Sequence, residues 1–173
     1  MKHLNSFADY TVDELKGILL LAEKIKKNQD AYAHILDGKK LYTLFEKTSN
    51  RTYLSFVIGM EELGGKAYNQ LWKDSNFTIG DLMSEIKYVG RNVDCIMGRF
   101  KKAEMTHCFM RYSTVPVING CDNTFHPTQA LADMLTLYEK TGHFDVNVLY
   151  IGAKNNSYNS LCEIVVKMGG NMY

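Results

Sequence analysis

Short apolar runs alternate with longer amphipathic stretches along most of this sequence, and that alternation constrains the possible folds more than any other feature. The run 41–45, Leu-Tyr-Thr-Leu-Phe, has the length and composition of a buried strand. Further strands are predicted over about 67–72, 94–97 and 115–118, with helices between them. Because strands joined through helices take right-handed crossovers, we predict an α/β fold whose parallel sheet is flanked by helices on both faces.

Local signals mark where several of these helices begin and end. Thr11-Val12-Asp13-Glu14 forms a capping box, in which Thr11 and Glu14 satisfy free amides of a first helix. A second helix is predicted from about Thr52 to the glycine pair 64–65, a common C-terminal signal. Others are predicted over about 81–91 and from about 102, and Pro127 marks a further helix start.

The last thirty or so residues read as the opening of another unit. A strand is predicted over 146–151 and a helix from about Ser157 to the glycine pair 169–170. One strand and one helix cannot bury their own apolar faces, so this segment either docks on the first domain or belongs to a domain that continues beyond it. We favour the second alternative and divide the chain into a first domain, 1–142, and the first strand and helix of a second α/β domain, 143–173.

Charge and cysteine usage exclude several classes of partner. Twenty Lys and Arg against 19 Asp and Glu create no overall field that would attract nucleic acid or an anionic membrane. The four cysteines are widely spaced, with no CxxC pair and no histidine run, so no metal site is expected. The N-terminal residues lack the apolar core of a signal peptide, and no apolar run reaches membrane-spanning length, so we expect a cytoplasmic protein.

The segment 45–52 carries the strongest chemical signal, because it lies between a predicted buried strand and a helix start. Free amides and the positive dipole end of such a helix attract phosphate. Ser49, Asn50 and Thr52 would add neutral donors, and Arg51 could clamp two phosphate oxygens. A capped helix with a solvated arginine explains the same residues.

A second segment, 125–133, also places polar residues at a helix start. His126 and Gln129 would project from the same end of that helix and could share a small ligand. The alternative is that His126 only caps the helix and Gln129 faces water. Arg99 follows the third predicted strand, so Arg51, Arg99, His126 and Gln129 should gather at one edge of the sheet. Together they suit a small, doubly charged phosphate ester or anhydride.

Longer runs around these residues resemble one enzyme family. FEKTSNRTYLSFVIGMEELGG is similar to the phosphate-binding segment of the aspartate and ornithine carbamoyltransferases, and VPVINGCDNTFHPTQALADMLTLYEKTG is similar to their His-Pro-x-Gln segment. The Phe-Glu-Lys and Ala-Leu-Ala-Asp stretches, and the first helix in LNSFADYTVDEL, resemble the ornithine branch. YIGAKNNSYNSL resembles the start of the family's second domain.

The resemblance implies carbamoyl transfer from carbamoyl phosphate to the side-chain amine of ornithine, giving citrulline and phosphate within arginine metabolism. It implies no metal, no cofactor, and a homotrimer when the protein is full length. By position, Ser49, Arg51 and Thr52 would bind the phosphate, with Asn50 beside them. The carbamoyl oxygen would meet Thr52, Arg99 and His126, so the catalytic residues would be Arg51, Thr52, Arg99 and His126. Gln129 would hold the carbamoyl amino group, and Asn156 the amino-acid part of ornithine.

Several positions depart from the family pattern. Asn50 replaces a usual Thr, Tyr53 a usual Arg and Ala153 a common Asp, while in the loop 73–85 only Gly80-Asp81 resembles the family. The chain also ends before the family's later amine-binding loops, so we expect a fragment that is inactive in isolation. The alternatives are a non-catalytic or diverged binding module, a carbamoyltransferase for putrescine or aspartate, and an unrelated phosphate-ester enzyme of the same fold class.

Overall fold

Four parallel strands form the main sheet in the computed structural model, which describes residues 1–173. Their order is β2-β1-β3-β4, with β1 at Lys40–Phe45, β2 at Lys66–Leu71, β3 at Cys95–Arg99 and β4 at Val117–Asn119. In register, Phe45 lies beside both Leu71 and Arg99, so the carboxyl ends of three strands meet at one edge. The predicted parallel α/β sheet is confirmed.

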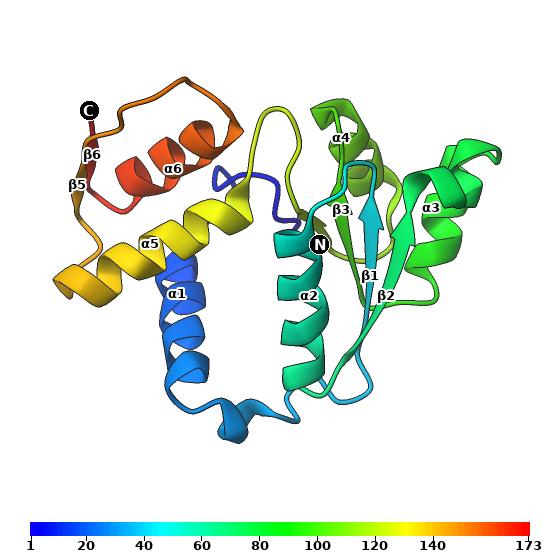
Figure 1. Cartoon of the computed structure of the whole chain (residues 1–173), viewed down its shortest axis with the longest axis horizontal. Helices are drawn as coiled ribbons and strands as arrows, with labels where there is room; N and C mark the ends of the chain where they lie inside the picture. The colour runs from blue at the N-terminus through cyan, green and yellow to red at the C-terminus, as the bar shows by residue number, and fades with distance from the viewer.

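Helices cover both faces of this sheet (Figure 1). Successive strand residues point to opposite sides, so each face packs against its helices with a different set of side chains. On one face, Leu41, Phe45 and Met97 pack with residues of α2 (Asn50–Glu62). On the other, residues such as Leu44 and Ile96 pack with α3 (Leu82–Gly90) and α4 (Ala103–Tyr112). The prediction for α2 was two residues late, because Ser49 caps the helix before Asn50.

A second hydrophobic cluster joins the chain's beginning to its end. It lies among α1 (Val12–Lys27), α5 (Pro127–Thr141) and α6 (Asn156–Lys167). The predicted capping box of α1 is present: the Glu14 amide donates to Thr11 Oγ1 at 3.2 Å, and the Thr11 amide donates to Glu14 Oε2 at 2.8 Å. Helix α5 begins at Pro127 as predicted and ends at Gly142, whose φ of 79° suits glycine.

The C-terminal segment forms a small β-α-β unit that docks on α5. Strands β5 (Asn147–Val148) and β6 (Asn171–Met172) pair in parallel as a separate sheet, with α6 between them. The strand predicted over 146–151 is therefore much shorter, because its only neighbour is two residues long. Buried residues of α6 lie in the same core as residues of α5, so this segment docks on the preceding part of the chain. The division of the chain into two domains at residue 142 stays a prediction.

The connection between β2 and α3 is an ordered loop with two short 3-10 turns, η2 (Trp72–Asp74) and η3 (Asn76–Thr78). Phe77 stacks on Trp72 of the same loop, with ring centroids 5.6 Å apart, and anchors the loop by packing on Phe109 of α4 at 5.3 Å. A further 3-10 turn, η1 (Gln29–Tyr32), follows α1. None of the helices combines the length and apolar character needed to cross a membrane.

Candidate active site

The N-terminus of α2 opens at the carboxyl edge of the sheet. Ser49 Oγ accepts the Thr52 amide at 3.3 Å and donates to Thr52 Oγ1 at 3.1 Å, which orients both hydroxyl groups. Arg51 lies exposed in the first turn, beside the helix amides that attract anions. This end of α2 therefore presents neutral donors and one free guanidinium to a ligand.

Arg99 is the last residue of β3 and points into the same region. Its Nη1 donates to Thr52 Oγ1 at 3.3 Å and to the Gly120 carbonyl at 3.1 Å. Its Nε is buried and has no hydrogen-bond partner. Since buried N–H groups are rarely left unpaired, this orphan donor marks a place where a ligand oxygen would be favourable.

His126 occupies the N-cap position of α5, but its side chain makes no capping hydrogen bond. Its Nδ1 lies 3.3 Å from Thr128 Oγ1. Burial and then the positive charge of Arg99 lower the pKa of His126 to about 4, against a raising effect of Asp122. The imidazole is therefore neutral at physiological pH, with one ring nitrogen that can donate a hydrogen bond and one that can accept one.

A single cavity of about 810 Å³, here called the sheet-edge cavity, lies between these groups. Its walls come from the N-terminus of α2, the end of β3, and the starts of α5 and α6. Seven of the predicted site residues line it: Ser49, Arg51, Thr52, Arg99, His126, Gln129 and Asn156. The structure therefore brings these charged and polar side chains together at the carboxyl edge of the sheet, as predicted.

Asn50 is the one predicted residue that does not line this cavity. It lies with Tyr53 in a separate hollow of about 160 Å³ beside the edge strand β2. Because consecutive residues in the first turn of a helix point in different directions, Ser49 and Arg51 can face the sheet-edge cavity while Asn50 faces away from it.

The amide side chains of Gln129 and Asn156 also make hydrogen bonds within the protein. Gln129 Nε2 donates to Asp133 Oδ1 at 2.9 Å, one turn along α5. Asn156 Nδ2 donates to the Asp122 carbonyl and lies 3.2 Å from Cys121 Sγ. The bond to Asp133 uses one of the two N–H donors of Gln129, and its Oε1 remains available to accept a hydrogen bond from a ligand.

The start of α6 is bound to the β4–α5 loop, residues 120–126. Besides the Asn156 contact, Asn159 Nδ2 donates to the Thr124 carbonyl at 2.9 Å. The His126 amide donates to Ser160 Oγ at 2.8 Å. The C-terminal unit thus contributes directly to the position of the loop that carries His126.

Sequence reasoning did not identify Lys47 or Cys121, which also line the cavity. Lys47 had an available signal, because it precedes the capped helix in the same polar run. Cys121 had none: its position follows from a backbone φ of 132°, unusual for a residue with a side chain. Burial raises the pKa of its thiol, so it is a neutral, poorly reactive group at physiological pH.

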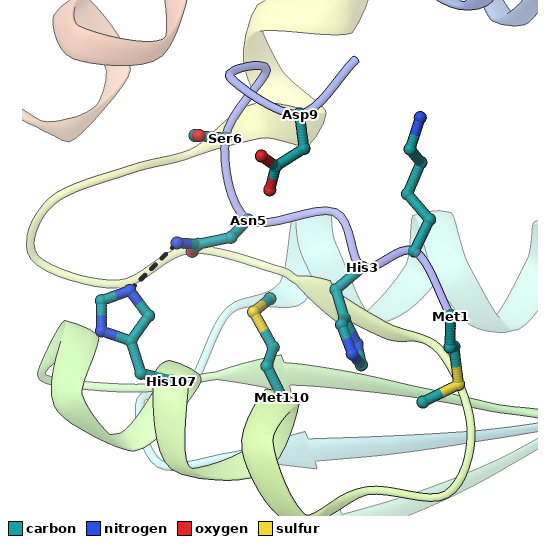
Figure 2. A pocket seen from close by; sticks show the side chains of 8 residues that line it. Met1, His3, Asn5, Ser6, Asp9, His107 and Met110 are labelled. Atoms are coloured by element: carbon teal, nitrogen blue, oxygen red, sulfur yellow. Dashed lines mark hydrogen bonds between the residues drawn. The ribbon is translucent and has the colours of Figure 1, made fainter.

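A different hollow, of about 610 Å³, surrounds the N-terminal segment and lies next to α4 (Figure 2). Asn5 Nδ2 and His107 Nε2 are 3.2 Å apart there. In addition, His3 Nδ1 accepts the Val117 amide at 3.1 Å. These contacts fasten the segment beside β4. The hollow contains no predicted site residue, and the molecule has no group of three or more His, Cys, Asp or Glu side chains placed to hold a metal ion.

Comparison with known proteins places these features in a family context. Residues 2–139 match the family profile described as the carbamoyl-P binding domain of aspartate/ornithine carbamoyltransferase. An ornithine carbamoyltransferase from Archaeoglobus fulgidus is 41% identical over 165 residues, which cover 93% of this chain and 54% of the relative. An anabolic ornithine carbamoyltransferase from Pyrococcus furiosus is 37% identical, over 95% of this chain and 53% of the relative.

Solved structures show the same relationship in three dimensions. The ornithine carbamoyltransferase structure from Pyrococcus furiosus superposes with a TM-score of 0.94 at 36% identity, covering 99% of this chain and 56% of that one. The enzyme from Thermus thermophilus gives 0.90 at 35% identity, covering 96% and 58%. This chain thus spans about half the length of the relatives it matches.

Proposed function

Since this chain belongs to the aspartate/ornithine carbamoyltransferase family, we propose that the protein transfers the carbamoyl group of carbamoyl phosphate to the side-chain amine of ornithine. The products would be citrulline and phosphate. Within this chain, we assign carbamoyl phosphate to the sheet-edge cavity. The observation that carries the assignment is the buried Nε of Arg99, which has no hydrogen-bond acceptor within the protein. Arg99 is the last residue of β3 and lies beside the N-terminus of α2.

In the proposed complex, the phosphate lies at the N-terminus of α2. Backbone amides and the dipole of this helix favour the negative charge, and Arg51 supplies a bidentate cation. Ser49 and Thr52 add hydroxyl donors. These groups stabilise the phosphate most when it carries the full charge of the leaving group, so they assist departure as well as binding.

The carbamoyl oxygen would lie among Thr52, Arg99 and neutral His126. A Thr128 hydroxyl that donates to Nδ1 would leave the proton of His126 on Nε2, free to donate to this oxygen. The amine lone pair forms a bond to the carbamoyl carbon, and negative charge collects on the oxygen. The carbonyl then re-forms as the bond to the phosphate oxygen breaks, the electron pair of that bond leaves with the phosphate, and the departing phosphate takes up the proton that the amine loses. Donors aimed at such an oxyanion typically contribute about 3 kcal/mol each.

The identity of the accepting amine rests on the relatives. The curated relatives named above as ornithine carbamoyltransferases are 37 and 41% identical to this chain; solved structures of ornithine enzymes range from 26 to 36%, and an aspartate transcarbamoylase structure from Trypanosoma cruzi is 25% identical. We therefore favour ornithine over aspartate or putrescine. Asn156, at the start of α6, is the residue of this chain that we assign to the amino-acid part of ornithine.

A second candidate function is a binding module without turnover. It is favoured by the internal hydrogen bonds of Asn156, whose Nδ2 donates to the Asp122 carbonyl and lies 3.2 Å from Cys121 Sγ. Turnover separates the two candidates. The protein should form a ureido product from carbamoyl phosphate with ornithine, but not with aspartate or putrescine. Binding of carbamoyl phosphate with no product from any amine would instead establish the module.

Ligand binding by this chain tests the site itself. Calorimetric titration with carbamoyl phosphate should give saturable heat, and Arg51→Ala should weaken binding roughly 10- to 150-fold, the effect of losing a charge-assisted hydrogen bond. Arg91→Ala, at the exposed C-cap of α3, removes an arginine away from the cavity and serves as the matched control. Equal affinities for all three proteins would refute the assignment.

We also propose that the intact protein is a cytoplasmic homotrimer. The support within this chain is on α2, where the apolar side chains of Leu54 and Ile58 are each close to half exposed. Such a surface is typical of an interface between subunits. Sedimentation equilibrium of the intact protein should give three times the chain mass, and a monomer at micromolar concentration would contradict the proposal.

A further inference from the structure

Asp122 is a buried carboxylate outside the residues assigned to substrates. It is 0% exposed and follows Cys121 in the β4–α5 loop. Neither lysine nor arginine forms an ion pair with it, so its charge is compensated by hydrogen bonds alone. A buried charge is costly unless it is fully hydrogen-bonded, and the arrangement around it indicates a specific role.

Each oxygen of this carboxylate accepts two hydrogen bonds. Oδ1 accepts the backbone amides of Thr124 at 2.7 Å and Phe125 at 2.8 Å, the two residues that precede His126. Oδ2 accepts the hydroxyl of Thr106, on α4, at 2.8 Å and the side-chain amide of Asn119, at the end of β4, at 2.9 Å. The carboxylate therefore ties the backbone before His126 to one strand and one helix of the sheet.

The Asn119 contact extends this arrangement to Arg99. Asn119 Nδ2 is held by Asp122 and by Asn5 Oδ1 at 2.9 Å, which turns its Oδ1 toward the Cys121 amide, also at 2.9 Å. That bond helps to maintain the φ of 132° at Cys121, a conformation that needs support from its surroundings. The adjoining Gly120 carbonyl is the acceptor that holds Arg99 Nη1.

We propose that Asp122 is a positioning residue for the carbamoyl-phosphate site, acting through the loop backbone to bring Arg99 and His126 to the same ligand. One set of its hydrogen bonds fixes the approach to His126, and the other fixes the turn whose carbonyl orients Arg99. The proposal rests on the function proposed above, because the ligand whose oxygen both side chains meet is carbamoyl phosphate.

Two substitutions remove different parts of the arrangement. Asp122→Asn retains the shape but removes the charge and sets a donor against Asn119 Nδ2. Thr106→Val retains the charge and the volume but removes one hydroxyl donor. Two further substitutions serve as controls. Thr106→Ser keeps the hydroxyl donor, and Asp145→Asn removes an exposed carboxylate elsewhere in the protein.

Calorimetric titration of each variant with carbamoyl phosphate, and separately with inorganic phosphate, tests the proposal. We expect affinity for carbamoyl phosphate to fall about 10-fold or more in Asp122→Asn, the effect of one misplaced charge-assisted contact, and by less in Thr106→Val. Thr106→Ser should recover to within about 2-fold, and Asp145→Asn should equal the unmodified chain. Because inorganic phosphate reaches only the α2 end of the cavity, its affinity should change less than that of carbamoyl phosphate.

The imidazole of His126 reports separately on the loss of the Asp122 charge. Followed by NMR in the folded proteins, its pKa should fall further in Asp122→Asn, because the carboxylate that raises it is gone, and should keep its value in Thr106→Val.

Two results would overturn the proposal. One is a folded Asp122→Asn protein with reduced thermal stability but unchanged affinity for carbamoyl phosphate. If that variant does not fold, unchanged affinity in folded Thr106→Val has the same force. Failure of the unmodified chain to bind either ligand would overturn the proposed function together with this inference, whereas binding by the unmodified chain and all folded variants alike would overturn the inference alone.

Discussion

Replacing Arg99 with methionine should abolish most of the ligand affinity while leaving stability nearly unchanged. Arg99 is a partly buried cation without a carboxylate partner, and its Nε has no acceptor at all. Methionine has a similar length and no donor to leave unpaired. The substitution therefore separates what this side chain does for a ligand from what it does for the fold.

The expected stability change follows from opposing contributions of similar size. The substitution removes hydrogen bonds from Arg99 Nη1 to Thr52 and to Gly120. Each bond to a charged donor contributes about 1.5 to 3 kcal/mol. The substitution also relieves two penalties of the unmodified protein. One is the buried unpaired N–H, which destabilises the fold by about 1 to 3 kcal/mol, and the other is the desolvation of an unpaired charge, which destabilises it by several more when burial is complete. Thr52 Oγ1 keeps a donor from Ser49. We expect a net change within about 1 kcal/mol, a shift of roughly 2 to 4 °C in the melting temperature.

Ligand affinity should respond differently, because no opposing contribution exists. Loss of the Arg99 contact to the carbamoyl oxygen should weaken carbamoyl phosphate binding roughly 10- to 150-fold. Differential scanning calorimetry and isothermal titration of the same preparations measure both quantities, with Arg91→Met as the control expected to change neither. A melting temperature lower by more than about 10 °C, or an unchanged affinity, would refute the reasoning.

Three further substitutions or conditions test the fold and the site. Phe77→Ala should cost about 3 to 5 kcal/mol in chemical denaturation, because a buried ring stacked on Trp72 leaves a cavity; a loss below about 1 kcal/mol would contradict that packing. Gly98→Ala should cost about 1 to 3 kcal/mol by the same measurement, since the new methyl group would lie 2.1 Å from a ring carbon of Phe100, and a neutral effect would contradict the close approach. His126 should make stability fall as pH drops from about 6.5 to about 4, because the unfolded state binds a proton that the folded state resists. His126→Gln should remove that part of the pH dependence, and identical pH profiles would count against the lowered pKa.

Local sequence signals predicted those features that depend on neighbouring residues. The capping box at Thr11 and Glu14 and the start of α5 at Pro127 follow from which side chains can satisfy free helix amides, and both are present. Local signals also located the strand and helix ends that carry Arg51, Arg99 and His126. The predicted parallel topology then brings the carboxyl ends of the strands to one edge, where the three side chains line one cavity.

Features that depend on contacts between distant parts of the chain could not be predicted from local sequence signals. Nothing near Asp122 in the sequence indicates that its partners include Thr106 and Asn119, which are brought together only by the packing of α4 against the sheet. Likewise, the internal bond of Asn156 to the Asp122 carbonyl arises because α6 docks on α5. The strand predicted over 146–151 is short because pairing, rather than composition, determines where it ends.

The attachment of α6 to the β4–α5 loop has a mechanical consequence. Asn156, Asn159 and Ser160 lie within two turns of one helix, and their bonds reach Asp122, Thr124 and His126 along a single stretch of backbone. A helix moves as a rigid body, so a ligand that draws α6 to a new position must either break these bonds or carry the loop along. Where the bonds hold, a displacement of α6 therefore carries the backbone of His126 with it.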